Sequence, residues 1–123
     1  MPTLAERALE LHARSRGKIA VQPKLPLASM EDLALVYSPG VGAVSQRIAA
    51  VLADVDAYTW RKNAVAVVSD GSAVLGFGNI GPRAALPVME GKCAIFKRFA
   101  GIDAVPLVLG TQDPDEIVRI VAA

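Results

Sequence analysis

The stretch of residues 65–92 constrains this chain most, because an apolar segment, a glycine-rich loop and a helix with an internal proline follow one another there. Apolar runs at 65–68 and 73–75 flank the turn signal of residues 69–72 and predict two short strands. Pro82 stands where a helix can begin without losing a backbone hydrogen bond. A strand that leads through a glycine loop into a helix N-terminus is suited to hold an anion.

The rest of the chain alternates helical and strand-like segments. Capping residues and apolar spacing predict helices at residues 4–16, 30–36, 43–52, 84–99 and 114–123, a strand at 105–109 and a loop at 54–62. Pro87 is expected to kink or restart its helix. This alternation predicts an α/β fold, a three-layer sheet with mainly parallel strands and helices on both faces, plus N-terminal helices. We expect one domain over residues 1–123, with a helical part over about 1–60 and an α/β part over about 61–123.

Composition narrows the functional classes. The 123 residues are 53% hydrophobic, yet no apolar run approaches the ~20 residues of a membrane span. A net charge of +1 and scattered basic residues argue against nucleic acid as a partner. One cysteine, Cys93, excludes an internal disulfide, and the N-terminus lacks the apolar segment of a signal peptide. We therefore expect a cytoplasmic protein with a single core, whose surplus apolar residues fill buried strands and a covered interface.

The glycine pattern leaves three interpretations. Gly76, Gly78 and Gly81 satisfy the dinucleotide-binding motif between a strand and a helix. An NAD site also needs an acid about 20 positions on, at the end of the next strand, and Asp103 has this spacing but precedes its strand. The loop therefore holds a small carboxylate, or only permits close packing of helix on strand, or, least favoured, binds a dinucleotide.

Three motifs carry a family resemblance. They are Tyr37-Ser-Pro-Gly-Val41, the glycine-rich segment of residues 67–82, and Ala85-Leu-Pro-Val-Met-Glu-Gly-Lys92. In this order they resemble the N-terminal domain of bacterial malic enzymes, and the similarity runs from the first helix to the last. The chain is similar as well to the malic-enzyme half of fused proteins that carry a phosphotransacetylase-like domain.

The resemblance implies a part in the oxidative decarboxylation of L-malate to pyruvate, with NAD or NADP reduced and Mg²⁺ or Mn²⁺ required. The family's lysine falls on Lys92 and acts as general base on the malate hydroxyl. The family's tyrosine falls on Tyr37 and protonates the enolpyruvate carbon after CO₂ leaves. The metal of the family polarises the oxygen and stabilises the enolate. A homodimer is also expected from the resemblance.

The sequence around both side chains suits these roles. A lysine in water has a pKa of about 10.4, so a lysine base that works near neutrality must be desolvated or lie near positive charge. Lys92 stands among apolar residues at 88, 89 and 93–95, which predicts a desolvating setting. Tyr37 follows the apolar run of residues 33–36, which predicts a buried ring with its hydroxyl in a cleft at a break between two helices. Cys93 is predicted to be a packing residue rather than a nucleophile.

The chain departs from the family pattern at one place. Larger malic enzymes carry an arginine just before the glycine loop to hold a malate carboxylate, whereas this chain has Ser72 and Ala73 there. We therefore expect the amides of the loop and one side chain to contact the substrate; the predicted substrate-binding residues are Gly78, Asn79, Ile80 and Gly81. The family's metal ligands and cofactor domain lie further along than Ala123. We expect the chain alone to bind neither metal nor nicotinamide cofactor productively, and to turn over no malate.

Two other functions stay open from the sequence. The domain could serve as a dimerisation or assembly module of a larger malic enzyme or fused protein, because exposed apolar surface can pair two copies. It could instead be a stand-alone dinucleotide-binding module. Titration with NAD and NADP, followed by the fluorescence of Trp60, would distinguish the second possibility.

Overall fold

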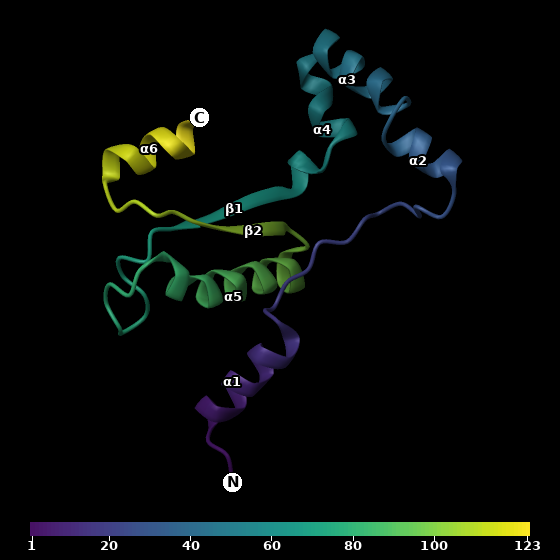
Figure 1. Ribbon diagram of the computed structural model, residues 1–123. Helices are drawn as coiled ribbons and strands as arrows, with labels where there is room; N and C mark the ends of the chain where they lie inside the picture. The colour runs from purple at the N-terminus through teal and green to yellow at the C-terminus, as the bar shows by residue number, and fades with distance from the viewer. The chain divides into compact units, whose positions relative to one another are not determined.

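The computed structural model describes residues 1–123 and divides them into two compact units. The first unit combines residues 1–19 with residues 65–123, and the second comprises residues 20–64. The chain is mixed α/β, with many helices and one small parallel sheet, as the sequence predicts (Figure 1). None of its helices has the length and apolar character that a membrane crossing requires.

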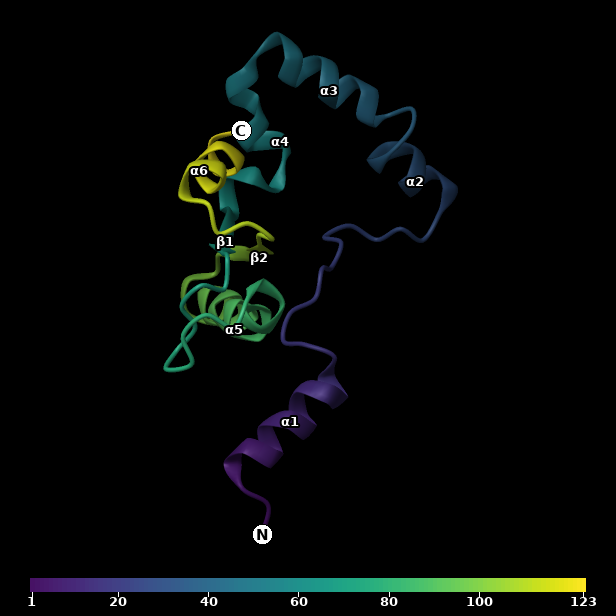
Figure 2. The ribbon, with the colours of Figure 1, turned by 60° about the vertical axis from the view of Figure 1, so that its left-hand side comes forward.

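A strand–helix–strand connection forms the frame of the first unit. β1 (Ala64–Ser69) leads into α5 (Pro82–Ala100), and β2 (Asp103–Val108) returns beside β1. The Leu109 amide donates to the Ser69 carbonyl at 2.8 Å, which joins the carboxyl ends of the two strands. α5 packs against β2, and α6 (Pro114–Ala122) lies on the other side of the strands (Figures 1 and 2). Helices therefore lie on both sides of the parallel sheet, as predicted, although the sheet has only two strands.

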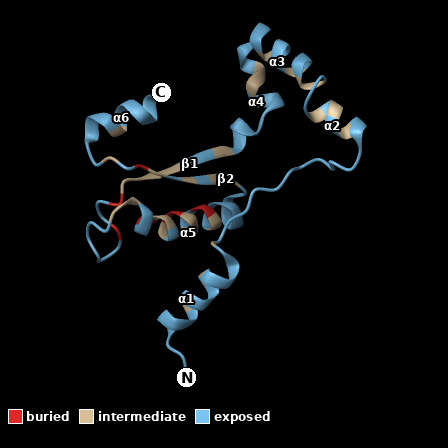
Figure 3. Cartoon of the chain, viewed as in Figure 1, coloured by how far each residue is buried: buried red, intermediate tan, exposed pale blue.

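The hydrophobic core lies along one face of α5. Ala85, Met89 and Cys93 are 0%, 7% and 1% exposed, and their spacing of four residues is that of an amphipathic helix. Val74 and Leu109 complete the buried apolar set, so the core gathers between α5 and the ends of the strands (Figure 3). The predicted single core is thus confined to the first unit. The expectation that surplus apolar residues fill buried strands is wrong, because most large apolar side chains outside this set are exposed.

Pro87 does not restart α5, so that part of the prediction is wrong. The helix runs unbroken from Pro82 to Ala100 with Pro87 inside it. A proline takes away the hydrogen-bond partner of the carbonyl four residues earlier, which here belongs to Arg83. Because Arg83 is exposed in the first turn, water can satisfy that carbonyl. Gly101, with a φ of 67°, ends the helix as predicted.

The N-terminal helix α1 (Leu4–Ser15) begins at the predicted cap. The Glu6 amide donates to the Thr3 hydroxyl at 3.2 Å, and the Thr3 amide donates to the Glu6 carboxylate at 2.7 Å. Beyond α1, Lys18 binds α5 at two points. Its amide donates to Glu90 Oε2 at 3.0 Å, and its Nζ donates to the Pro87 carbonyl at 2.8 Å. These contacts attach the end of the N-terminal segment to α5.

In the second unit, α2 (Met30–Val36) and α3 (Val41–Ala50) meet at a tight turn. α2 begins at the predicted Ser29 cap. The Gly40 amide donates to the Ala34 carbonyl at 2.9 Å, and a Cβ at position 40 would lie 2.6 Å from the same oxygen. α3 begins two residues earlier than predicted, because Gly40 already has helical φ and ψ values of −59° and −39°.

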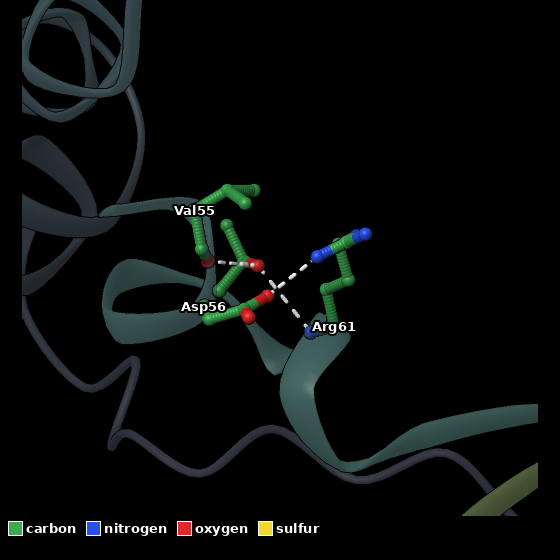
Figure 4. A network of polar contacts seen from close by, with 4 residues as sticks. Val55, Asp56 and Arg61 are labelled. Carbon is green, nitrogen blue, oxygen red and sulfur yellow. Dashed lines mark hydrogen bonds and ion pairs between the residues drawn. The ribbon is translucent and has the colours of Figure 1, made fainter. Parts of the chain in front are cut away.

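The predicted loop at residues 54–62 is wrong, because this segment forms short helical turns: η1 (Leu52–Asp54), α4 (Val55–Tyr58) and η2 (Trp60–Asn63). The Thr59 hydroxyl donates to the Val55 carbonyl at 2.6 Å and accepts from the Arg61 amide at 3.3 Å (Figure 4). The Arg61 guanidinium also pairs with Asp56 at 2.6 Å. Side-chain bonds of this kind stabilise single turns that are too short to show a helical period in the sequence.

Candidate functional site

The segment between β1 and α5, residues 70–81, closes on itself, and we call it the glycine loop. The Ile80 and Gly81 amides donate to the Gly71 carbonyl at 3.2 and 3.1 Å. A Cβ on Gly71 would overlap the Gly81 carbonyl and would lie 2.6 Å from the Pro82 nitrogen. Gly71 also has a φ of 72°, a value that residues with a Cβ rarely adopt. Glycine at position 71 is therefore what allows the two ends of the loop to meet.

The tip of the glycine loop replaces the predicted strand at residues 73–75. The Val74 amide donates to the Gly78 carbonyl at 2.9 Å, and the Phe77 amide donates to the Val74 carbonyl at 3.0 Å. Leu75 has a φ of 51° and is 74% exposed. The strand prediction is wrong because the apolar run folds into a turn that buries only Val74.

Asp70 shapes the beginning of the glycine loop. Its carboxylate accepts hydrogen bonds from the Ser72 amide at 2.9 Å and from the Ser72 hydroxyl at 2.7 Å. These two bonds hold the pKa of the Asp70 carboxyl below its usual value, because they favour the ionised form. Asp70 is consequently a charged acceptor whose contacts are already made within the loop.

The four predicted substrate-binding residues differ in what they can offer a ligand. The amides of Ile80 and Gly81 are already bonded to the Gly71 carbonyl. The amides of Gly78 and Asn79 donate no hydrogen bond within the chain. The prediction that residues 78–81 present their amides to an anion is therefore narrowed to the first two of them.

The Asn79 side chain, also predicted to contact substrate, is paired with Gln112. Asn79 Nδ2 donates to Gln112 Oε1 at 2.8 Å, and Gln112 Nε2 donates to Asn79 Oδ1 at 3.0 Å. Asn79 Oδ1 also accepts from the Gly81 amide at 3.3 Å, and Gln112 Nε2 lies 3.4 Å from the Asp70 carbonyl that it bonds. This pair ties the glycine loop to the segment between β2 and α6.

The predicted base, Lys92, stands in the middle of α5 with its side chain exposed. The predicted desolvation by its sequence neighbours is wrong: Cys93 turns into the core, about 100° around the helix from Lys92, while Ile95 is itself 59% exposed. Lys92 lies about 15 Å along the helix axis from Pro82. Because helical side chains lean toward the N-terminus, Lys92 leans toward the end of α5 that carries the glycine loop.

Two residues near Lys92 have structural roles. Glu90 is half-buried and accepts the hydrogen bond of the Lys18 amide. Burial raises the pKa of the Cys93 thiol, and the nearby Glu90 charge adds to this effect. A buried thiol of raised pKa is a poor nucleophile, and this agrees with the predicted packing role of Cys93.

Tyr37, the predicted acid, is the C-cap of α2, so its predicted position at the break between two helices is confirmed. The Tyr37 amide donates to the Leu33 carbonyl at 2.9 Å, and the Tyr37 carbonyl accepts from the Val41 amide at 2.7 Å. The prediction of a buried ring is wrong, because Tyr37 is 68% exposed and no residue of α2 is buried. Tyr37 belongs to the second unit and Lys92 to the first.

No group of three or more His, Cys, Asp or Glu side chains is placed to hold a metal ion.

The glycine loop also differs from a dinucleotide-binding turn. In that turn the first glycine follows the strand directly, whereas residues 70–75 separate β1 from Gly76. Asp103, the one acid at the expected spacing, is the first residue of β2 and pairs with Lys97 at 2.7 Å. It thus lies at the amino end of its strand, away from the edge where a ribose would bind.

A glycine loop at the carboxyl ends of two parallel strands defines an α/β domain of the class that places ligands at this edge. The family model "Malic enzyme, N-terminal domain" matches residues 16–119. This chain therefore belongs to the malic enzyme N-terminal domain family.

Individual relatives agree with this assignment. The chain is 51% identical over 119 residues to the bifunctional malic/malolactic enzyme of Bacillus subtilis, covering 97% of the chain and 29% of that enzyme. It is 50% identical over 121 residues to the NADP-dependent malic enzyme of Escherichia coli, covering 98% of the chain and 16% of that enzyme. The crystal structure of an NAD-dependent malic enzyme from Thermotoga maritima superimposes with a TM-score of 0.89 at 50% identity, over 93% of the chain and 30% of that protein. The chain thus spans less than a third of each relative.

Sequence reasoning missed three residues that shape this region: Gln112, Lys18 and Glu90. Gln112 meets a residue 33 positions earlier, and Lys18 meets a residue 72 positions later. Local periodicity and motif spacing carry no signal for contacts of such separation. The sequence motif predicts a role for Asn79, but its partner Gln112 is identified only in the folded structure.

Proposed function

We propose that this chain supplies the malate-binding part of an enzyme that oxidatively decarboxylates L-malate to pyruvate and CO₂, with NAD or NADP and a divalent metal ion. The observation that carries the proposal is that Tyr37, the glycine loop and Lys92 all lie within the 104 residues, 16–119, that match the family model. The names of the relatives include both NAD- and NADP-dependent malic enzymes. Both cofactors accordingly belong in the test.

Lys92 is proposed to take the proton from the malate hydroxyl while hydride leaves the same carbon. Its backbone is held firmly, since the next residue, Cys93, is buried in the core. Its exposed side chain is accessible to a ligand that lies alongside α5. In this proposal the bound substrate and the remaining parts of a malic enzyme cover Lys92 and supply the desolvation that the chain itself does not.

Tyr37 is proposed to give a proton to the enolpyruvate carbon after CO₂ has left. The turn that carries it is fixed by backbone hydrogen bonds on both sides, at Leu33 and at Val41. A rigid backbone and an accessible hydroxyl suit a residue that must deliver a proton to one carbon atom.

The glycine loop is proposed to hold a malate carboxylate. The free amides of Gly78 and Asn79 are neighbours in the chain, and two adjacent N–H groups can bond one carboxylate. This arrangement would replace the arginine that larger malic enzymes carry before the loop. We further propose that the chain alone has no turnover with malate.

A chimera tests the proposed function. In it, this chain replaces the matching N-terminal segment of the Bacillus subtilis bifunctional malic/malolactic enzyme. Malate-dependent reduction of NAD or NADP, with equimolar pyruvate and CO₂, is the expected result. A chimera that is folded and binds cofactor but oxidises no malate would contradict the proposal. The isolated chain, assayed in parallel, is expected to be inactive.

A second proposed function is assembly of a homodimer through α1, and one observation favours it. Leu4, Leu9 and Leu11 are 80%, 73% and 51% exposed on this helix. Apolar side chains on an amphipathic helix commonly pair with a second copy. Light scattering should give the mass of a dimer for the chimera and of a monomer for its Leu11→Glu variant. A monomeric unsubstituted chimera would contradict this function.

A further inference from the structure

The amide pair between Asn79 and Gln112 stands out because it is reciprocal. Each side chain donates one hydrogen bond to the other, at 2.8 and 3.0 Å. The two residues come from different parts of the first unit, since Asn79 is in the glycine loop and Gln112 lies between β2 and α6. No motif in the sequence joins them.

Gln112 is itself held in place by the segments around it. On one side, the Leu109 amide bonds the Ser69 carbonyl at the end of the sheet. On the other side, Asp113 caps α6 by accepting from the amides of Asp115 and Glu116. Gln112 therefore projects from a fixed point at the carboxyl edge of the strands, where α/β folds place their ligands.

Asn79 passes this constraint to the backbone of the glycine loop. Its Oδ1 accepts from the Gly81 amide at 3.3 Å, so the Asn79 side chain connects Gln112 to the loop backbone at Gly81. Gln112 Nε2 also reaches the Asp70 carbonyl at the other end of the loop. The amides of Gly78 and Asn79, which have no partner in the chain, lie within the segment that these bonds hold.

We propose that Gln112 is a positioning residue that acts through Asn79 to fix the direction of the free Gly78 and Asn79 amides toward a substrate carboxylate. This inference rests on the proposed binding of malate by the glycine loop. An exposed hydrogen bond between neutral amides adds little to stability. The role of the pair is therefore to orient the loop. Removing the pair is expected to weaken substrate binding and to change the free energy of unfolding little.

Two measurements test the inference. The first is hydrogen exchange of the Ile80 and Gly81 amides in the 123-residue chain, which needs no activity. Gln112→Ala should speed exchange at both amides about tenfold, because the loop opens more often. The second is steady-state kinetics of the chimera, in which Gln112→Ala should raise KM for malate about tenfold and leave kcat within about twofold.

Three variants sharpen the test. Gln112→Glu keeps the shape but sets a carboxylate oxygen against Asn79 Oδ1 and the Asp70 carbonyl, so its KM should be at least as high as that of Gln112→Ala. In an Asn79→Ala background, Gln112→Ala should have no further effect on KM, because the two residues act as one unit. Gln46→Ala, on the exposed face of α3, is the matched control and should change neither readout.

The outcomes separate the two proposals. Unchanged exchange at Ile80 and Gly81 in Gln112→Ala would overturn the anchoring of the loop. Faster exchange with an unchanged KM for malate would overturn the role in substrate positioning. An inactive unsubstituted chimera would instead count against the proposed function, while the exchange measurement would still decide whether Gln112 holds the loop.

Discussion

Gly71 and Gly81 touch so closely that a Cβ on Gly71 would overlap the Gly81 carbonyl. Gly71→Ala should therefore destabilise the chain by more than about 2 kcal/mol, from both steric overlap and the positive φ. The matched control is Gly76→Ala, because a Cβ at Gly76 meets no atom within 4 Å. Thermal unfolding measures both variants. Equal melting temperatures for the two would contradict the close approach at the base of the glycine loop.

The turn that carries Tyr37 depends on Gly40. A Cβ at Gly40 would lie 2.6 Å from the Ala34 carbonyl, so Gly40→Ala must push α2 away from α3. We expect at least a tenfold loss of kcat in the chimera, because Tyr37 would be displaced. Gly42→Ala is the control, since position 42 is open and lies within α3. That change should raise stability by up to about 1 kcal/mol and preserve activity.

The contact between Lys18 and Glu90 fixes the N-terminal segment on α5. Glu90→Ala removes the acceptor of the Lys18 amide and should cost about 1 kcal/mol, since the contact is partly exposed. Trypsin should then cut after Lys18 several times faster. The Glu90→Gln variant retains an acceptor, so trypsin should cut it after Lys18 at nearly the original rate. Cleavage at equal rates in all three proteins would show that Glu90 does not hold this segment.

The pH dependence of the glycine loop follows from Asp70. Its pKa is lower in the fold than in the unfolded chain, because Ser72 donates two hydrogen bonds to the carboxylate. The stabilisation is therefore fully present above the unfolded pKa of about 3.9 and is lost as pH falls through the lower, folded value. Ser72→Ala should move the Asp70 pKa upward in an NMR titration. The Ser72 backbone amide, the larger cause, remains in this variant, so an identical titration curve would exclude the Ser72 hydroxyl as a contributor.

Much of the fold could be predicted because its signals are local. The caps at Thr3 and Ser29, the strand at β1 and the helix stop at Gly101 each depend on residues within a few positions. The failures have a different origin. Residues 73–75 have the composition of a strand, but the closure of the loop at Gly71 folds them into a turn. Backbone contacts between residues nine and ten positions apart overrode the local strand preference there.

For the candidate site, the sequence selects residues by motif but does not predict their surroundings. The motifs singled out Tyr37 and Lys92, and the fold puts the first at a helix break and the second on α5. Their burial could not be predicted from apolar neighbours in sequence, because adjacent residues on a helix point in different directions. Lys92 and Cys93 illustrate this, since one is exposed and the next is 1% exposed.

The most direct test of the whole account is the turnover of malate by the chimera after Lys92→Ala and after Tyr37→Phe. Each change should lower kcat by about 10² to 10⁴, because each removes a proton-transfer group, while the oligomeric mass stays the same. Lys97→Ala, an exposed lysine on the same helix, should stay within about twofold. Full activity in Lys92→Ala would contradict the account, because no other residue of this chain is assigned the role of base.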